Sequence, residues 1–377
     1  MHMSDALLSP AVGLAMDAIS LAAVGISVAK VNKDEFSEKK IPIMGVAGAM
    51  VFAAQMINFT IPATGSSGHI GGGIMLAGLL GNVPAFLSIT AVLIIQCLFF
   101  ADGGLLALGA NIFNMGVIPC LIVYPLIFRP LLASRRRLPG AAERIGYRRL
   151  SVASITSAMI ALELGALCVV IQTTLSGITA LPFGAFAALM LPIHLVIGLV
   201  EGVVTSMVLC FILRMRPEII ISAQSGKRLS GVSTKKAVIA LAALTIIVGG
   251  ALSLFSSANP DGLEWAVGRT ASTATGGDIA RGAGTTGAAE AAGGAGASAD
   301  AASNSVIAAA GDSAQNSIDD KPVTAILPGY AYKSDPDNTT GTSVSGVVGA
   351  AVTFALAGTA GLVISIVKRN KKAEKNV

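Results

Sequence analysis

Eight long apolar runs with few or no charges constrain this chain more than any other feature of its sequence. They occupy about residues 7–29, 41–62, 70–100, 104–128, 150–173, 184–213, 236–256 and 344–367. A helix needs about 20 such residues to cross the hydrocarbon core of a membrane, where only helices and closed barrels satisfy their backbone. Charged residues make up 12% of the chain, against ~25% in soluble proteins, which excludes a large water-soluble domain. We therefore predict an all-α, polytopic membrane protein.

Basic clusters between the runs predict how the helices are oriented. The clusters lie at about 30–40, 129–149, 214–236 and 368–372, and the positive-inside rule places all four on the cytoplasmic side. Three runs separate the first two clusters, so one of these runs must cross the membrane twice. The run 70–100 is too long for one span, and Gly81-Asn82-Val83-Pro84 is a turn signal at its middle. We predict nine spans, with the N-terminus outside and the C-terminus inside; a re-entrant half-helix over 70–81 is the alternative.

The same runs predict two domains. Residues 1–230 contain seven spans, and residues 231–377 contain two spans joined by a long external segment. Within that segment, about residues 270–318 are rich in Ala, Gly, Ser and Thr without apolar periodicity, which is typical of a flexible linker. No basic stretch precedes the first run, so we expect the N-terminus to remain on the mature protein.

Several functional classes are excluded by missing motifs. The chain has no G-x-x-x-x-G-K-[ST], G-x-S-x-G, H-E-x-x-H or C-x-x-C motif. It therefore cannot hydrolyse ATP through a P-loop of its own, and nothing in it predicts an enzyme or a prosthetic group. Its basic clusters orient the spans rather than bind nucleic acid, so we expect the lipid bilayer to surround it.

His2 is the first candidate for metal chemistry, because it occupies the second position of the chain. The Met1 amine, the deprotonated His2 amide nitrogen and the His2 imidazole can chelate one ion through fused five- and six-membered rings. Three nitrogens in a plane, completed by a fourth, suit Ni(II), Cu(II) or Co(II). The alternative is that a histidine at this position is incidental.

His69 lies in a Gly/Ser-rich loop, Thr64 to Gly73, between the second span and the divided run. Charge parity places this loop on the same outer side of the membrane as His2. Such a loop can enter a membrane cavity where protein buries its backbone. An ordinary polar loop with an incidental histidine is again the alternative.

Ionisable residues within the spans are functional candidates because charges are costly there. His194 and Glu201 are two helical turns apart on one face of the run 184–213, and Asp17 and Glu163 lie deep in other runs. For His194 and Glu201, a transport role and a bond that locks helices together are equally consistent with the sequence.

A stripe of small residues on the second run, Gly45, Ala49 and Ala53, has the spacing that permits close helix approach. The helix that approaches this stripe could belong to the same chain or to a partner.

Three stretches together resemble the CbiM/NikM family, the substrate-capture (S) components of energy-coupling factor transporters for cobalt or nickel. They are residues 1–10, the loop residues 66–69, and the run 99–105 with 108–115. The resemblance covers about residues 1–215 and implies a seven-helix S component whose N-terminal tip plugs a metal site. It implies Met1, His2 and His69 as ligands. Supporting or loop positions near that site are Asn58, Ser66, Ser67, Asp102 and Asn111.

The resemblance also implies partners and a location. Such a subunit works with a cytoplasmic ATPase pair of the ABC type and a transmembrane coupling protein in the cell membrane of a prokaryote. Docking of these partners on small-residue faces makes Gly45, Ala49 and Ala53 the candidate docking surface. Downstream, residues 259–265 resemble the PDGLE domain, related to the two-helix CbiN/NikN partner, here fused to the same chain. The Ala/Gly-rich insert is not expected in that family.

These observations predict a membrane subunit of an ATP-driven importer that captures Ni²⁺ or Co²⁺. A stand-alone divalent-cation facilitator without ATPase partners is the main alternative, and a metal sensor that uses residues 257–342 for interaction is a third. The sequence does not separate nickel from cobalt.

Overall fold

Every apolar run of the sequence contains a helix in the computed structural model, which describes residues 2–30, 39–133, 145–179, 181–227, 229, 234–271, 328–330 and 339–374. The elements up to residue 230 are η1 (Asp5–Leu7), α1 (Pro10–Lys30), α2 (Ile41–Gln55), β1 (Phe59–Ile61), β2 (Ser66–Gly68), α3 (Gly73–Leu80), α4 (Asn82–Phe100), α5 (Leu108–Ile112), η2 (Phe113–Phe128), α6 (Arg129–Leu132), α7 (Tyr147–Ser176), α8 (Phe183–Met215) and α9 (Pro217–Ser225). They are followed by α10 (Lys235–Ile246), η3 (Ile247–Ala251), η4 (Leu252–Phe255), a helix over 262–271, η5 (Pro328–Tyr330) and α13 (Thr339–Glu374). Met1 and residues 272–327, which include most of the predicted linker, lie outside the described residues.

Two of the nine predicted spans are shorter than a full crossing. Within the described part of the chain, seven helical segments are long and apolar enough to cross a membrane. The helix α2 has 15 residues and α3 has 8, or about 22 and 12 Å at 1.5 Å per residue. The hydrocarbon core is about 30 Å thick, so seven of the nine predicted spans are long enough to cross it as helices, and crossing by α2 and α3 stays a prediction. The orientation of the bundle remains a prediction from the charge clusters.

The predicted division of the run 70–100 is confirmed, and Gly81 is where the chain turns. Gly81 lies between α3 and α4 with φ of +92°, a conformation that side chains with a Cβ rarely adopt. A Cβ at this position would lie 3.2 Å from the backbone oxygen of Ala223 in α9. Both the backbone angle and the close approach of α9 therefore favour glycine at this turn.

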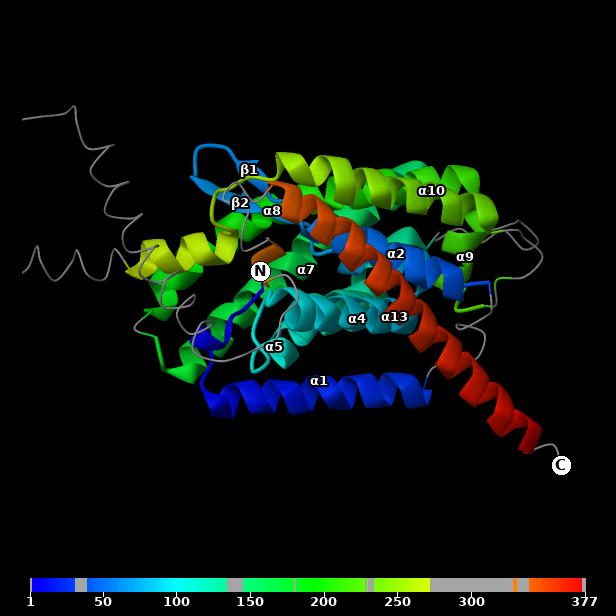
Figure 1. Cartoon of the computed structure of the whole chain (residues 1–377), viewed down its shortest axis with the longest axis horizontal. Coiled ribbons are helices and arrows are strands. Elements are labelled where there is room, and N and C mark those ends of the chain that lie inside the picture. Colours follow the sequence, from blue (N-terminus) through cyan, green and yellow to red (C-terminus); the bar gives the residue numbers. More distant parts are fainter. Residues whose placement is uncertain are drawn as a thin grey trace, which may run out of the picture.

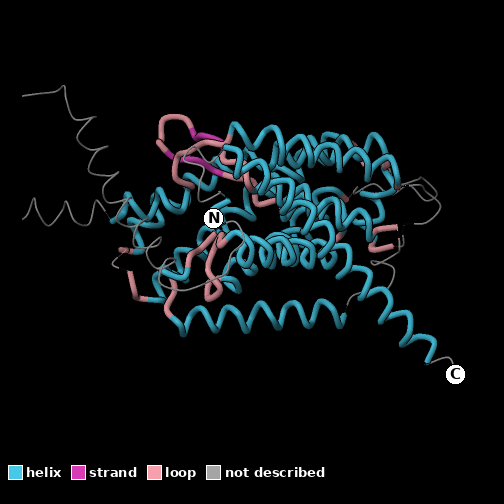
Figure 2. The backbone as a smooth tube through the Cα atoms, viewed as in Figure 1, coloured by secondary structure: helices cyan, strands magenta, loops and turns pink. Residues whose placement is uncertain are grey.

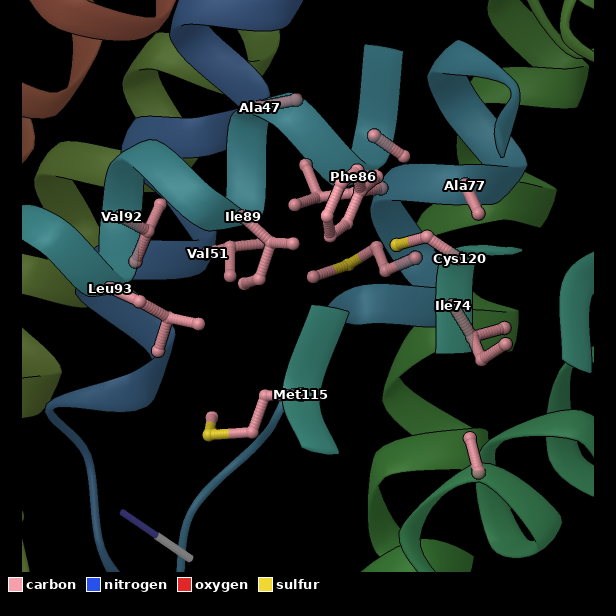
Figure 3. Packing of buried hydrophobic residues seen from close by; sticks show 14 of the residues in the cluster. Ala47, Val51, Ile74, Ala77, Phe86, Ile89, Val92, Leu93, Met115 and Cys120 are labelled. Carbon is pink, nitrogen blue, oxygen red and sulfur yellow. The ribbon is translucent and has the colours of Figure 1, made fainter. Parts of the chain in front are cut away.

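Small and large apolar side chains fill the centre of the bundle where α2, α3, α4 and η2 meet. Figure 3 shows Val51 of α2, Ile74 of α3, Phe86 of α4 and Met115 of η2 in this core, all 3% exposed or less. In a membrane, such packing holds helices together by van der Waals contact, because lipid tails are as apolar as the side chains.

The two C-terminal spans pack against α2 of the preceding bundle. A Cβ at Gly45 would lie 2.9 Å from the backbone oxygen of Phe354 in α13, and a Cβ at Gly249 in η3 would lie 3.2 Å from the Cβ of Ala53. Ala49, between them on the stripe, is 4% exposed. In this structure the small-residue face of α2 is therefore occupied from within the chain and is not exposed to a separate partner.

The N-terminus lies among the helices rather than on the periphery of the bundle. Figure 1 shows it between α4, α5 and α7, and Figure 2 shows the two strands and their loop at the same end of the molecule. The helix α9 and the turn at Gly81 lie at the opposite end. The fold therefore places the beginning of the chain and the predicted metal loop together.

We predict that the turn between α3 and α4 faces the cytoplasm. Cysteine introduced at half-buried Asn82 should be protected from a membrane-impermeant maleimide added to intact cells and should react once the cells are opened. Cysteine at exposed Pro62, in the loop between β1 and β2, is the matched control and should react from outside. Labelling of Asn82→Cys in intact cells would refute the predicted orientation.

Candidate metal centre

The structure brings together the two histidines that the sequence analysis selected. The rings of His2 and His69 are stacked, with centroids 5.1 Å apart and planes inclined by 16°. Both side chains are 8% exposed. Residue 2 and the loop between β2 and α3 thus form one buried imidazole pair at the end of the bundle.

Hydrogen bonds to α5 and to the residue before it fix the chain directly after His2. The N–H of Met3 donates to Oδ1 of Asn111 at 2.7 Å, and Nδ2 of Asn111 donates to the carbonyl of Met3 at 3.1 Å. The N–H of Ala107 donates to Asp5 at 2.9 Å. Asn111, predicted as a supporting residue, therefore holds the N-terminal tip through both backbone groups of Met3.

Further along the N-terminal segment, α1 is bonded to the start of α5. The N–H of Gly109 donates to Asp17 at 2.7 Å, and the hydroxyl of Ser20 donates to the carbonyl of Gly109 at 2.6 Å. The intramembrane carboxylate of Asp17 thus has a structural partner and positions α1.

The loop that carries His69 is a short antiparallel hairpin followed by extended chain. Its strands pair Phe59 with Gly68 and Ile61 with Ser66. Ser66 shares a hydrogen bond of 2.8 Å with Thr64 within the loop. Ser66 thereby stabilises the hairpin. Its hydrogen bonds in the described structure do not involve His2 or His69.

A segment from the C-terminal part of the chain continues this hairpin. The hydroxyl and N–H of Ser67 donate to the carbonyls of Asn259 and Pro260, each at 2.8 Å. At the other strand, the N–H of Asn58 donates to Ser256 at 2.8 Å, and the N–H of Ser257 donates to the carbonyl of Asn58 at 2.7 Å. Ser67 and Asn58 therefore anchor the loop to residues 256–260.

Glu201 of α8 holds the lower end of the loop. Its two carboxylate oxygens accept the N–H groups of Gly71 and Gly72, at 2.8 and 3.0 Å, directly before α3 begins. Glu201 is 1% exposed, and Gln55 donates to the carbonyl of Gly71 at 2.8 Å. Non-helical backbone at membrane depth is tolerated only where protein satisfies it in this way.

His194 does not pair with Glu201, although both are buried on one face of α8. Its Nδ1 lies 2.8 Å from the carbonyl of Met190 in the same helix. A carbonyl only accepts, so this contact assigns the ring proton to Nδ1 and leaves Nε2 unprotonated. Nε2 is buried and has no hydrogen-bond partner among the residues that the structure describes. The bond of His194 thus stays within α8, whereas Glu201 links α8 to the loop before α3. A transport role for His194 or Glu201 stays a prediction.

Two carboxylates flank the imidazole pair. Oδ1 of Asp102 lies 3.5 Å from Nδ1 of His2, and Oδ2 of Asp261 lies 3.8 Å from Nε2 of His69. Asp102 was selected from the sequence. Asp261 entered the sequence analysis only within residues 259–265, which resemble the PDGLE domain, and its position beside His69 was missed because the two lie far apart in the chain.

Tyr330 is a second residue that sequence reasoning missed. Its hydroxyl donates to the other oxygen of Asp102 at 2.5 Å, and its ring stacks on Phe100 with centroids 4.8 Å apart. Only the tertiary fold reveals this residue, because no motif surrounds it.

Burial controls the protonation of the imidazole pair. It lowers the pKa of His2, an effect that the nearby charge of Asp102 opposes, and it holds the pKa of His69 well below its usual range. Both rings are therefore neutral at neutral pH, which is the form in which imidazole binds metals.

Side chains alone do not complete a metal site in the described part of the chain, where no group of three or more His, Cys, Asp or Glu residues is arranged to hold an ion. An ion bound at the imidazole pair would need further donors besides the two rings.

Two family models match the chain. The CbiM model, described as a cobalt uptake substrate-specific transmembrane region, matches residues 2–219. The PDGLE domain model matches residues 235–298 and 288–366.

Individual relatives match the same part of the chain. A protein of Haloquadratum walsbyi that is named as a metal transport protein is 34% identical over 232 residues, 61% of this chain and 98% of the relative. One of Archaeoglobus fulgidus, named as a fused nickel transport protein, NikMN, is 33% identical over 224 residues, 58% of this chain and 68% of the relative. A crystal structure described as a transition metal transporter is 30% identical, covers 61% of this chain and 100% of its own, and has a TM-score of 0.49.

We expect Glu201→Ala to loosen the loop, because it leaves two buried N–H groups unpaired. Each such group costs about 1–3 kcal/mol, so the free energy of unfolding should fall by about 2–6 kcal/mol. Thermal unfolding of the purified protein in detergent measures this. Glu163→Ala is the matched control: Glu163 also lies in a span, but its Oε1 has no hydrogen-bond partner among the described residues. An equal loss in both variants would contradict the assigned role.

Proposed function

Because the chain belongs to the CbiM family of cobalt-uptake transmembrane regions and carries a fused PDGLE domain, we propose that it captures Ni²⁺ or Co²⁺ for an ATP-driven importer. It is a multi-pass membrane transport protein and not an enzyme. The observation that carries the proposal is the buried pairing of His2 with His69 at one end of the bundle.

The proposed ligands are the Met1 amine, the His2 amide nitrogen, the His2 imidazole and the His69 imidazole. The chelate uses Nδ1 of His2, since this atom closes the six-membered ring with the amide nitrogen. Nδ1 is also the atom that faces Asp102, so an ion would take the place of the proton between them. Asn111 supports the chelate by holding Met3 from both backbone groups.

The charges around the pair suit a divalent cation. A deprotonated amide nitrogen contributes one negative charge to the ligand set. Asp102 lies beside His2 and Asp261 lies beside His69. Attraction between a cation and these carboxylates is stronger in a buried site than in water. The hydroxyl of Tyr330 keeps one oxygen of Asp102 directed away from the ion.

We further propose that the PDGLE part stabilises the capture loop, our name for residues 59–72, which carry His69. Residues 256–260 bond to both strands of the hairpin, and Nε1 of Trp265 donates to the carbonyl of Thr64 at 2.9 Å. On this proposal, residues 1–230 form the capture domain and residues 231–377 form the two-span domain that supports it. The Ala/Gly-rich insert contributes no ligand.

An ATP-driven importer requires an ATPase pair and a coupling protein, which the family implies and which this chain does not supply. A facilitator that needs no ATPase remains the alternative, and a sensor would show no uptake. The ion itself is left open by the comparisons, since the family description names cobalt and the Archaeoglobus relative is named for nickel. Neighbouring genes for cobalamin synthesis or for nickel enzymes would separate the two ions.

We predict that adding the dipeptide Gly-Pro before Met1 destroys tight binding while leaving every side chain in place. The addition turns the amine of Met1 into an amide and removes one of four nitrogen ligands. Proline has no N–H, so the new terminal amine cannot join the chelate, as it could in the single-residue extension Gly-Met-His. Since chelates of this size contribute about 10–16 kcal/mol, the dissociation constant should rise at least ~100-fold. Titration calorimetry with Ni(II) and Co(II) measures the change, and His2→Ala and His69→Ala should cause comparable losses.

The matched control is the same dipeptide added after Val377, which should leave affinity unchanged. An N-terminally extended chain that binds as tightly as the native one would exclude Met1 and His2 as chelating ligands.

We also predict that binding releases between one and two protons per ion at pH 7.5. The amide proton must leave, and the amine, with an ordinary pKa of about 7.7–8.0, is partly protonated. The imidazoles contribute none, because burial lowers the pKa of both. Affinity should therefore fall as pH decreases. Calorimetry in buffers of different ionisation enthalpy counts the protons, and a count of zero would contradict amide ligation.

A further inference from the structure

A small cavity lies directly beneath the capture loop. It has a volume of about 20 Å³, which is room for one water-sized particle. Its lining includes His69 and Gly71 of the loop, Met115 of η2, and His194 and Ile197 of α8. Two imidazoles from different elements therefore border one space of atomic dimensions.

His194 is oriented toward ligand binding. Its Nδ1–H donates to the carbonyl of Met190. The residue is 1% exposed, and its unprotonated Nε2 is buried without a hydrogen-bond partner among the described residues. Metal-binding histidines have this arrangement, in which a backbone carbonyl fixes one ring nitrogen and leaves the other to the ion. A buried lone pair without a partner is otherwise unfavourable.

A second cavity of about 20 Å³ adjoins the first and extends it along the bundle. The two share Gly71, Met115 and Leu162, and the second reaches Asn114 and Glu201. Together they lead from the imidazole pair past His194 and toward the start of α3.

We propose that His194 is a ligand of an inner binding position for the transported ion, in the cavity between His69 and His194. The proposal rests on the proposed function, because it requires an ion at His2 and His69. His69 borders both positions. The ion moves inward when the nitrogens at residues 1 and 2 release it, the His2 amide regains its proton from water, and Nε2 of His194 takes their place. A divalent cation cannot enter an apolar space without donors, and His194 supplies one in a wall that also includes Met115, Leu162 and Ile197.

The occupant that competes with an ion is a buried water molecule bonded to Nε2. A structural role of His194, through its bond to Met190, is the other competing account. These three accounts predict different responses to substitution of His194.

The decisive test measures Co(II) binding by its visible absorption in the full chain extended by the dipeptide Gly-Pro before Met1. This extension disables the N-terminal chelate but leaves the inner position. The extended chain should retain weak Co(II) binding, and His194→Leu in the same background should weaken it at least 10-fold. His194→Asn should cause the same loss, because asparagine can still donate to the carbonyl of Met190 but lacks a second ring nitrogen.

Thr205→Val in the same background is the matched control. Thr205 is also a buried polar residue of α8 without a described partner for its hydroxyl, and it lines neither cavity. It should leave Co(II) binding unchanged. Rescue of binding by His194→Asn would show a structural role, and unchanged binding in both His194 variants would leave the cavity to water; either result overturns the proposal.

The native chain, assembled with its transport partners, provides a second readout. His194→Leu should lower the rate of Co(II) uptake more than it lowers equilibrium binding at the capture site. Equal losses of uptake and binding would contradict an inner position. Failure of the capture proposal is recognised separately, because the N-terminal extension would then leave tight binding intact.

Discussion

The absence of water from a membrane interior is the constraint on which the rest of this structure depends. Non-helical backbone can enter that interior only where the protein replaces every hydrogen bond that water would make. Glu201 does this for the capture loop by accepting the N–H groups of Gly71 and Gly72, and Gln55 donates to the carbonyl between them. Because the extended chain covers part of the crossing, α3 needs only its 8 residues to reach the turn at Gly81. The position of His69, two residues before these bonds, follows from the same anchoring.

The capture loop is therefore held from three directions by parts of the chain that are distant in sequence. Its hairpin is internal, Glu201 fixes its lower end, and residues 256–260 extend its strands. The N-terminal tip is fixed independently through Asn111. The proposed ligand set would need such anchoring, because the donors of a metal site must be held within about 0.5 Å of their working geometry. The fused C-terminal part is thus a structural component of the capture end, and its α13 also covers the small-residue face of α2.

Sequence reasoning reached much of this arrangement where the signal was local. Run length and basic clusters led to the division at Gly81, and position in the chain led to His2 and His69. It did not foresee how short α2 is, because the apolar run 41–62 contains both α2 and strand β1. It also missed Asp261 and Tyr330 as neighbours of the imidazole pair. Their contacts with His69 and Asp102 join residues that are far apart in the chain, 228 positions in the case of Tyr330 and Asp102, and no spacing rule reports such pairs.

By itself, the sequence determined the class of the protein, the helices and the candidate ligands, because hydropathy, turn residues and nitrogen donors are properties of short segments. Only the tertiary structure decided which of these candidates meet and in what roles. It assigned Glu201 to the loop rather than to His194, placed His194 in the wall of a cavity with its Nε2 unpaired among the described residues, and assigned the small face of α2 to α13. These outcomes depend on how helices pack, and packing in a membrane is decided by close contact and by the need to pair every buried polar group.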